Sequence, residues 1–288
     1  MMDYSRIGER FREIRTSQKL SLKDLASDKV TYGQIAKFER CEQMIATDKF
    51  FYLVNRLNLT PNEFFYEFGD FRFNDFEQLT DRMVMYFQND DKEKIRELID
   101  EFEKSEKEST VYHLLNLTML RIVANELDDT IIVSEQEVQF LSDYLFGVET
   151  WTTYEITLFS NSITLLAPDL IGPLTLELLK NDKSYSKIPS RKALIRATTL
   201  NALTILIKNQ KFLIAEVVRD YLKPLISKDV LIELAIFEFL DNLLQYQHHA
   251  SRKYIARNDE ILLGLHLLGH QTPLLDQLIS KMRHQSGR

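Results

Sequence analysis

A short segment near the beginning of the chain carries closely spaced side chains that can hydrogen-bond to nucleic acid. In a helix over this segment Ile35 and Phe38 face inward, which leaves the polar side chains outside. A glutamine can pair with adenine, a lysine can reach guanine or a phosphate, and a hydroxyl can bond to the sugar–phosphate backbone. In isolation the pattern also fits a merely solvated helix face. The candidates for these contacts are Thr31, Tyr32, Gln34, Lys37 and Arg40.

A second short helix is predicted directly before this segment. Ser21 is a favourable N-cap, and Asp24 lies at the capping-box distance behind it. Leu22, Leu25 and Ala26 give this helix one apolar face. Two short helices joined by a tight connection predict a helix-turn-helix, whose second helix can enter the major groove of double-stranded DNA.

Four asparagines recur at nearly constant spacing along the rest of the chain. They are separated by 45, 40 and 41 residues, and each lies in the middle of the first helix of a predicted helical hairpin. Hairpins repeated at this spacing stack into a solenoid whose first helices line a concave surface. The four residues are Asn116, Asn161, Asn201 and Asn242, and two of them begin the similar segments NSITLL and NALTIL.

The recurrent asparagines have the chemistry to bind a peptide. A side-chain amide offers a donor and an acceptor, so it can pair with the backbone of an extended peptide whatever its sequence. Specificity for the peptide side chains would then come from nearby walls formed by Tyr154, Phe159 and side chains such as Leu165. Arg196, one turn before Asn201, could bind a terminal or side-chain carboxylate of the peptide. Asparagines that are only solvent-exposed are the alternative. The predicted peptide-binding residues are Tyr154, Phe159, Asn161, Arg196, Asn201 and Asn242.

Composition indicates an all-α protein. The 288 residues include only 8 Gly and 6 Pro, so long helices can run uninterrupted, and 44% hydrophobic residues are enough for a buried core. The single cysteine, Cys41, excludes a disulfide framework. The chain has no apolar run of about 18 residues and no signal-peptide pattern. We therefore expect a cytoplasmic protein without a membrane partner.

The order of the predicted helices divides the chain into a head and a body. Thr47 or Asp48 is expected to cap the fourth helix of the head, and Thr60-Pro61-Asn62-Glu63 is a strong start signal for the fifth. The predicted segments are a five-helix helix-turn-helix domain at 1–68, a linker at 69–74 and a helical-repeat domain for peptide binding and dimerisation at 75–288.

Charge is distributed unevenly between the beginning of the chain and the remainder. Residues 1–40 contain nine Lys or Arg and six Asp or Glu, a net charge of +3. The whole chain carries −7, which leaves −10 on the remainder. This argues against indiscriminate nucleic-acid binding and favours a protein that contacts DNA only through its head.

The head resembles the lambda-repressor-like helix-turn-helix family at Gly8, Arg15, Leu20, Leu25, Ala26, Ile35, Phe38, Glu39 and Arg40. Head and body together are similar to the Rgg (Rgg/GadR/MutR) regulators of Gram-positive bacteria. This similarity extends over the full length and includes the W-x-x-Y-E-x-x-L-F-x-N stretch from Trp151 to Asn161. The resemblance implies a cytoplasmic transcription factor with a right-handed tetratricopeptide-like body. It further implies a short, imported, hydrophobic signalling peptide as the ligand, as in quorum sensing.

The resemblance also implies roles for residues of the head. Arg15 and Glu39 match a pair that forms a partly buried salt bridge, and Arg12 and Arg15 could reach phosphates. Two positions depart from the family pattern. Cys41 replaces a glycine in the left-handed conformation, where a side chain costs on the order of 1 kcal/mol. Leu22 replaces a glutamine that reaches a phosphate and braces the recognition helix.

No catalytic set is recognisable in the sequence, so we expect no enzyme and no cofactor. His266 and His270 have the i, i+4 spacing of a zinc pair, but no third ligand is evident, which favours an ordinary helix face. Two other functions stay open. One is an interaction protein whose repeat body binds a protein partner. The other is a pH- or redox-responsive transcription factor without a peptide ligand, an idea that rests on the six His and Cys41.

A homodimer is expected, because one recognition helix covers too few base pairs for useful specificity. The terminal segments ILLGLHLLG and TPLLDQLI contain more Leu and Ile than the last helices of a solenoid need. We therefore expect the interface between the two bodies in these segments.

Overall fold

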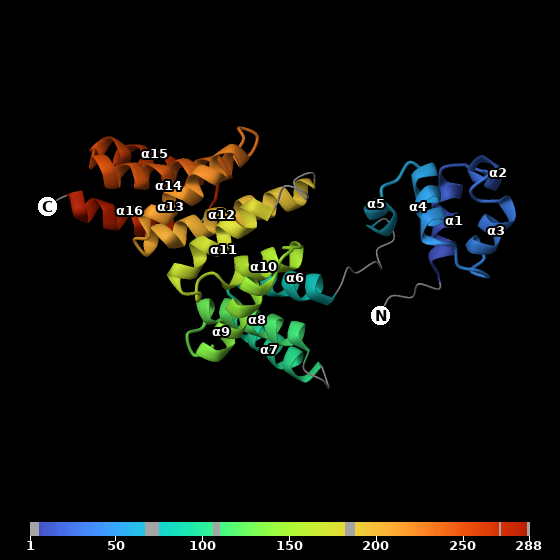
Figure 1. Cartoon of the computed structure of the whole chain (residues 1–288), viewed down its shortest axis with the longest axis horizontal. Helices are drawn as coiled ribbons and strands as arrows, with labels where there is room; N and C mark the ends of the chain where they lie inside the picture. The colour runs from blue at the N-terminus through green and yellow to red at the C-terminus, as the bar shows by residue number, and fades with distance from the viewer. Residues whose placement is uncertain (1–5, 67–74, 106–109, 182–187, 271, 287–288) are drawn as a thin grey trace. The chain divides into compact units, whose positions relative to one another are not determined.

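The computed structural model describes residues 6–66, 75–105, 110–181, 188–270 and 272–286. Every regular element in this described part is a helix (Figure 1), which confirms the predicted all-α class. Contacts divide the chain into two compact units, Met1–Asp81 and Arg82–Arg288. The predicted linker at 69–74 lies outside the described residues, and the segment boundaries inferred from the sequence stay predictions.

Five short helices precede residue 67 and share one core. Four phenylalanine rings meet in this core, with centroids 5.2 to 6.3 Å apart: Phe11, Phe38, Phe50 and Phe64. The rings come from four of the five helices, so each of these helices depends on the others for burial of its apolar face. The helices are α1 (Ile7–Ser17), α2 (Leu22–Leu25), α3 (Tyr32–Glu39), α4 (Thr47–Arg56) and α5 (Pro61–Tyr66).

Local capping signals account for three of the helix starts in the head, those of α2, α3 and α5. Ser21 and Asp24 form the predicted capping box at α2, and α5 begins at Pro61 with Glu63 bonded to the preceding threonine. The predicted cap of α4 is wrong. This helix begins at Thr47, and its N-cap is Ala46, which offers no side-chain hydrogen bond.

A glycine allows α1 and α3 to approach closely. A Cβ atom built on Gly8 would lie 1.8 Å from the carbonyl oxygen of Phe38. Backbone cannot yield to such an overlap without moving one helix, so only glycine fits this position. The close approach brings the end of α3 onto α1, where the polar contacts described below form.

The second unit consists of helical hairpins. The first helices of successive hairpins, α8, α10, α12 and α14, pack one against the next, and we call them the first-helix row. Partner helices pack against this row, and α16 contacts both α15 and α12. This confirms the predicted tetratricopeptide-like solenoid (Figure 1). The helices are α6 (Asp75–Gln88), which belongs to this unit from Arg82 on, α7 (Lys92–Ser105), α8 (Val111–Leu127), α9 (Glu135–Gly147), α10 (Thr153–Ser162), α11 (Pro168–Asn181), α12 (Pro189–Lys208), α13 (Phe212–Leu222), η3 (Lys223–Leu225), α14 (Leu231–His249), α15 (Arg252–Leu267) and α16 (Pro273–Ser286).

Candidate DNA-contacting face and ligand cavity

Helix α3 begins with a capping box that uses two of the predicted contact residues, Thr31 and Gln34. The Thr31 hydroxyl accepts a hydrogen bond from the Gln34 N–H (3.3 Å), and Gln34 Oε1 accepts one from the Thr31 N–H (3.1 Å). Bidentate recognition of adenine requires that same amide oxygen. Gln34 Oε1 also accepts from Lys49 Nζ (3.5 Å), so while both contacts are intact only the Nε2 donor of Gln34 remains for a base.

Helix α3 ends in a Schellman motif centred on Cys41. The Cys41 N–H donates to the Phe38 carbonyl (2.9 Å), and the Glu42 N–H donates to the Lys37 carbonyl (3.0 Å). Cys41 has φ = 56°, so it keeps the left-handed conformation of the glycine that the resemblance implies for this position. The recognition helix thus ends sharply, with its last carbonyl groups satisfied.

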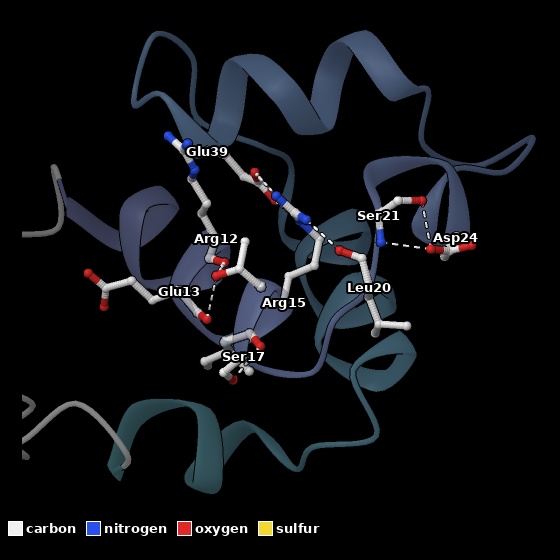
Figure 2. A network of polar contacts seen from close by, with 10 residues as sticks. Arg12, Glu13, Arg15, Ser17, Leu20, Ser21, Asp24 and Glu39 are labelled. Carbon is white, nitrogen blue, oxygen red and sulfur yellow. Dashed lines mark hydrogen bonds and ion pairs between the residues drawn. The ribbon is translucent and has the colours of Figure 1, made fainter.

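Arg15 is buried inside the head, where its side chain forms three hydrogen bonds. Its guanidinium donates two hydrogen bonds to the Glu39 carboxylate, at 2.6 and 2.8 Å, and a third to the Leu20 carbonyl at 2.5 Å (Figure 2). Both charged groups are buried, and the hydrogen bonds to Glu39 raise the pKa of Arg15. The predicted salt bridge is confirmed. A phosphate contact by Arg15 would break this network, so we do not assign one.

The outer face of α3 and the neighbouring part of α1 present cations of two kinds. Arg12 and Lys37 are exposed and form no ion pair with any residue that the structure describes. Arg40 donates two hydrogen bonds to Glu42, at 2.6 and 2.8 Å, and these bonds lower the pKa of Glu42. Tyr32 is exposed beside them. Arg12 and Lys37 are therefore free for DNA, whereas Arg40 must first leave a carboxylate.

The body contains a cavity of about 490 Å³ along the first-helix row. Residues from α6, α8, α10, α12 and α14 line it, together with the N-terminal end of α16. Much of the lining is apolar, with side chains such as Phe87, Ile205 and Leu275. Two of the recurrent asparagines, Asn161 and Asn201, also line this cavity. Apolar walls with a few polar groups are typical of ligand-binding sites.

The two asparagines in the cavity retain hydrogen-bonding capacity. Asn161 Nδ2 donates to the Thr157 carbonyl one turn earlier (2.9 Å), and its Oδ1 makes no hydrogen bond to the described residues. Asn201 is exposed, and neither atom of its amide bonds to the described part of the chain. An extended backbone in the cavity would find acceptors and donors here.

Three predicted peptide-contacting residues are instead used inside the body. Phe159 is fully buried in the core. Asn242 is also buried, and its Nδ2 donates to Asn258 Oδ1 (2.9 Å). The Arg196 guanidinium pairs with Glu233 on α14 and does not line the cavity. These side chains are satisfied by intramolecular packing and hydrogen bonds, so we remove them from the candidate site.

Tyr154 takes part in an aromatic cluster outside the cavity lining. Its hydroxyl donates to Oδ1 of Asn116 (2.9 Å), so the side-chain oxygen of this recurrent asparagine already has a hydrogen-bond partner within the body. The ring packs edge-on against Tyr112, with centroids 5.3 Å apart, and burial raises the pKa of Tyr154. Tyr154 therefore helps to hold α8 against α10.

Sequence reasoning missed the contributions of α6 and α16 to the cavity. Phe87 and Gln88 come from the end of α6, and Thr272 to Leu275 come from the beginning of α16. Because α6 is the first helix of a hairpin, the repeat pattern could have predicted that it lines the concave surface. The return of the terminal helix to α12 has no counterpart in the repeat pattern.

The described residues offer neither a metal site nor a membrane-spanning helix. They contain no group of three or more His, Cys, Asp or Glu side chains placed to hold a metal ion. His266 Nε2 lies 2.9 Å from the Thr272 hydroxyl, which joins α15 to the start of α16. None of the helices described is both long and apolar enough to span a bilayer.

Comparison with known proteins gives the family. Residues 96–276 match the family model described as the C-terminal domain of the HTH-type transcriptional regulator Rgg. The chain belongs to the Rgg family. This Rgg-family chain is accordingly a transcriptional regulator, as the resemblance to Rgg regulators implied.

Solved structures with the same fold extend over nearly the whole chain. The SHP pheromone receptor Rgg2 of Streptococcus dysgalactiae is 22% identical with a TM-score of 0.77, and the match covers 96% of this chain and 98% of Rgg2. A putative transcriptional regulator of Listeria monocytogenes is 20% identical with a TM-score of 0.79, covering 97% and 96%. PrgX in its complex with cCF10 is 16% identical with a TM-score of 0.72, covering 97% and 92%.

Proposed function

We propose that this Rgg-family regulator binds an operator through α3 and a short apolar signalling peptide through the cavity of its body. The peptide would be imported, as in quorum sensing. One observation carries the proposal: the Asn161 side-chain oxygen and the whole Asn201 amide make no hydrogen bond to the described residues, and both side chains line one largely apolar cavity. Similar proteins include an SHP pheromone receptor and a bacterial peptide pheromone/receptor complex, which supports a ligand of the same class here.

The dimensions of stacked helices suit an extended peptide. Asn161 and Asn201 lie on α10 and α12, which pack directly against each other. Packed helices are about 10 Å apart. An extended chain covers that distance in about three residues, so the two amides can hold successive units of one peptide backbone. The apolar lining then receives the side chains.

The DNA-binding part of the proposal rests on unpaired groups of the head. Lys37 on α3 is the candidate for a base or phosphate contact, and Arg12 is the candidate for a phosphate contact. The Thr31 or Tyr32 hydroxyl would contact the sugar–phosphate backbone. Gln34 contributes through its Nε2 atom and through the cap of the helix.

We further propose a homodimer that associates through α15. Leu263, Leu267 and the adjacent Leu268 are exposed, and they form an apolar strip at the end of this helix. By contrast, Leu275 and Ile279 on α16 are buried in the body's own core. This narrows the interface expected from the sequence to the α15 portion.

A mobility-shift assay on the promoter next to the gene tests the DNA-binding and peptide-binding parts of the proposal. Lys37→Ala should weaken specific binding by about 1–3 kcal/mol if a base contact is lost. Lys208→Ala removes the same charge from an exposed position at the end of α12, so it is the matched control and should bind normally. Adding the peptide encoded by a neighbouring short reading frame should change the affinity. Equal binding by Lys37→Ala and wild type would contradict the assignment of α3.

A further inference from the structure

A single charged side chain lines the cavity within the described part of the chain, and it is acidic. Glu126 lies near the C-terminal end of α8, and its carboxylate accepts a hydrogen bond from the Thr164 hydroxyl (2.7 Å). It forms no ion pair with a described residue. A hydroxyl donates a hydrogen bond but brings no positive charge, so the exposed carboxylate of Glu126 is solvated by water and is paired with no cation among the described residues.

Two arginines of the first-helix row do not supply the missing positive charge. Arg196 on α12 is paired with Glu233. Arg121, five residues before Glu126 on α8, is bonded to two other glutamates, so its surroundings are net acidic. The polar groups that share the cavity with Glu126 are hydroxyls and amides, which are neutral.

We propose that Glu126 selects peptides that carry a cationic group at this end of the cavity and rejects peptides with an acidic group there. This inference rests on the proposed peptide-binding function. A bound peptide displaces water from around the carboxylate and lowers the local dielectric constant, which strengthens its attraction to a cation. A carboxylate brought to the same place meets a like charge and a desolvation cost. The cation is either the N-terminal ammonium of the peptide or a lysine or arginine side chain.

Pools of short random peptides made from Leu, Ile, Val, Phe and Ala test the selection directly. All pools have amidated C-termini. The first has free N-termini, the second is N-acetylated, the third is N-acetylated with one Lys, and the fourth is N-acetylated with one Glu. The full-length protein is incubated with the mixed pools and separated by size, and the retained peptides are quantified by mass spectrometry. The first and third arms distinguish the terminal ammonium from a side-chain cation.

The variant that isolates the charge is Glu126→Gln, which can still accept the hydrogen bond from Thr164. Asp129→Asn removes the same charge from an exposed position close by that does not line the cavity. Wild type and Asp129→Asn should retain at least one cationic pool about two- to fivefold better than the acetylated neutral pool and should retain the acidic pool less than the neutral one. Glu126→Gln should lose this preference and retain the neutral pool as well as before.

Two results would overturn the inference in different ways. Retention of the pools without a charge preference, or a preference that persists in Glu126→Gln, would remove Glu126 as the selecting residue while leaving peptide binding in place. Failure of every variant to retain any pool would overturn the peptide-binding function and the inference together.

Discussion

The polar side chains of the head and those of the body cavity are used in opposite ways. In the head, the polar groups around α3 bond to one another: Arg15 to Glu39, Gln34 to the start of the helix, and Arg40 to Glu42. In the cavity, Asn201 and the oxygen of Asn161 make no hydrogen bond to the described residues.

This difference separates residues that build a binding surface from residues that are available to a ligand. Intramolecular hydrogen bonds fix the position of α3, so few of its side chains remain free for DNA. The exposed Asn201 amide contributes little to folding, because water satisfies it in the unbound protein. Loss of a bonded polar group should therefore reduce stability, and loss of a free one should reduce ligand affinity.

The largest expected effect is that of Arg15→Ala. It leaves the Glu39 carboxylate buried without its partner, which costs about 3–5 kcal/mol of the free energy of unfolding. Thermal or denaturant unfolding measures this loss, and operator binding should fall with it. Arg12→Ala, one turn earlier and exposed, should change stability by less than about 0.5 kcal/mol. Similar losses in the two variants would contradict the structural assignment of Arg15.

The next effect distinguishes two asparagines that the repeat pattern treats alike. Asn242→Ala leaves Asn258 Oδ1 without its donor in the core, which should destabilise the body by about 1–3 kcal/mol. Asn201→Ala removes an exposed amide and should leave the unfolding midpoint within experimental error. Unfolding curves of both variants in the same denaturant provide the comparison. A greater loss of stability in Asn201→Ala would reverse the assignment.

A smaller, stabilising effect is expected at the end of α3. Cys41→Gly removes the strain of a side chain in the left-handed conformation and should stabilise the head by about 1 kcal/mol. Differential scanning calorimetry should show a higher unfolding temperature. Cys41→Ser keeps a side chain at this position and should not stabilise, which separates backbone strain from an effect of the thiol.

The smallest expected effect concerns DNA affinity. Glu42→Gln releases Arg40 for a phosphate and should strengthen operator binding about two- to fivefold at low salt. Glu13→Gln removes an equal charge from an exposed position on α1 while leaving the Arg40 contacts intact. An equal gain in both variants, measured by mobility shift, would mean that net charge alone matters.

Much of the head could be predicted from the sequence because its signals are local. Ile35 and Phe38 are buried and Lys37 is exposed, as the helical period of α3 predicted. The start of α2 followed from its capping residues. The start of α4 did not, because Ala46 caps that helix without any side-chain hydrogen bond.

The cavity was only partly predictable, because its composition depends on packing between distant helices. The recurrence of Asn161 and Asn201 located two of its residues. The same recurrence misplaced Asn242, since its partner Asn258 belongs to another helix and the spacing carries no information about that contact. Glu126 could not be predicted as a site residue, because glutamates are common near helix ends. Only the structure shows that it lines the cavity without an ion-pair partner among the described residues.

Peptide binding by the double variant Asn161→Ala/Asn201→Ala tests the central claim most directly. Isothermal titration calorimetry would use the peptide encoded beside the gene, with Asn209→Ala as the control. Asn209 makes the same amide-to-carbonyl bond one turn back but lies outside the cavity lining. The double variant should fold normally and bind the peptide at least about tenfold more weakly, since each lost amide is worth about 1–3 kcal/mol. Unchanged affinity in the folded double variant would place the ligand elsewhere and contradict the account.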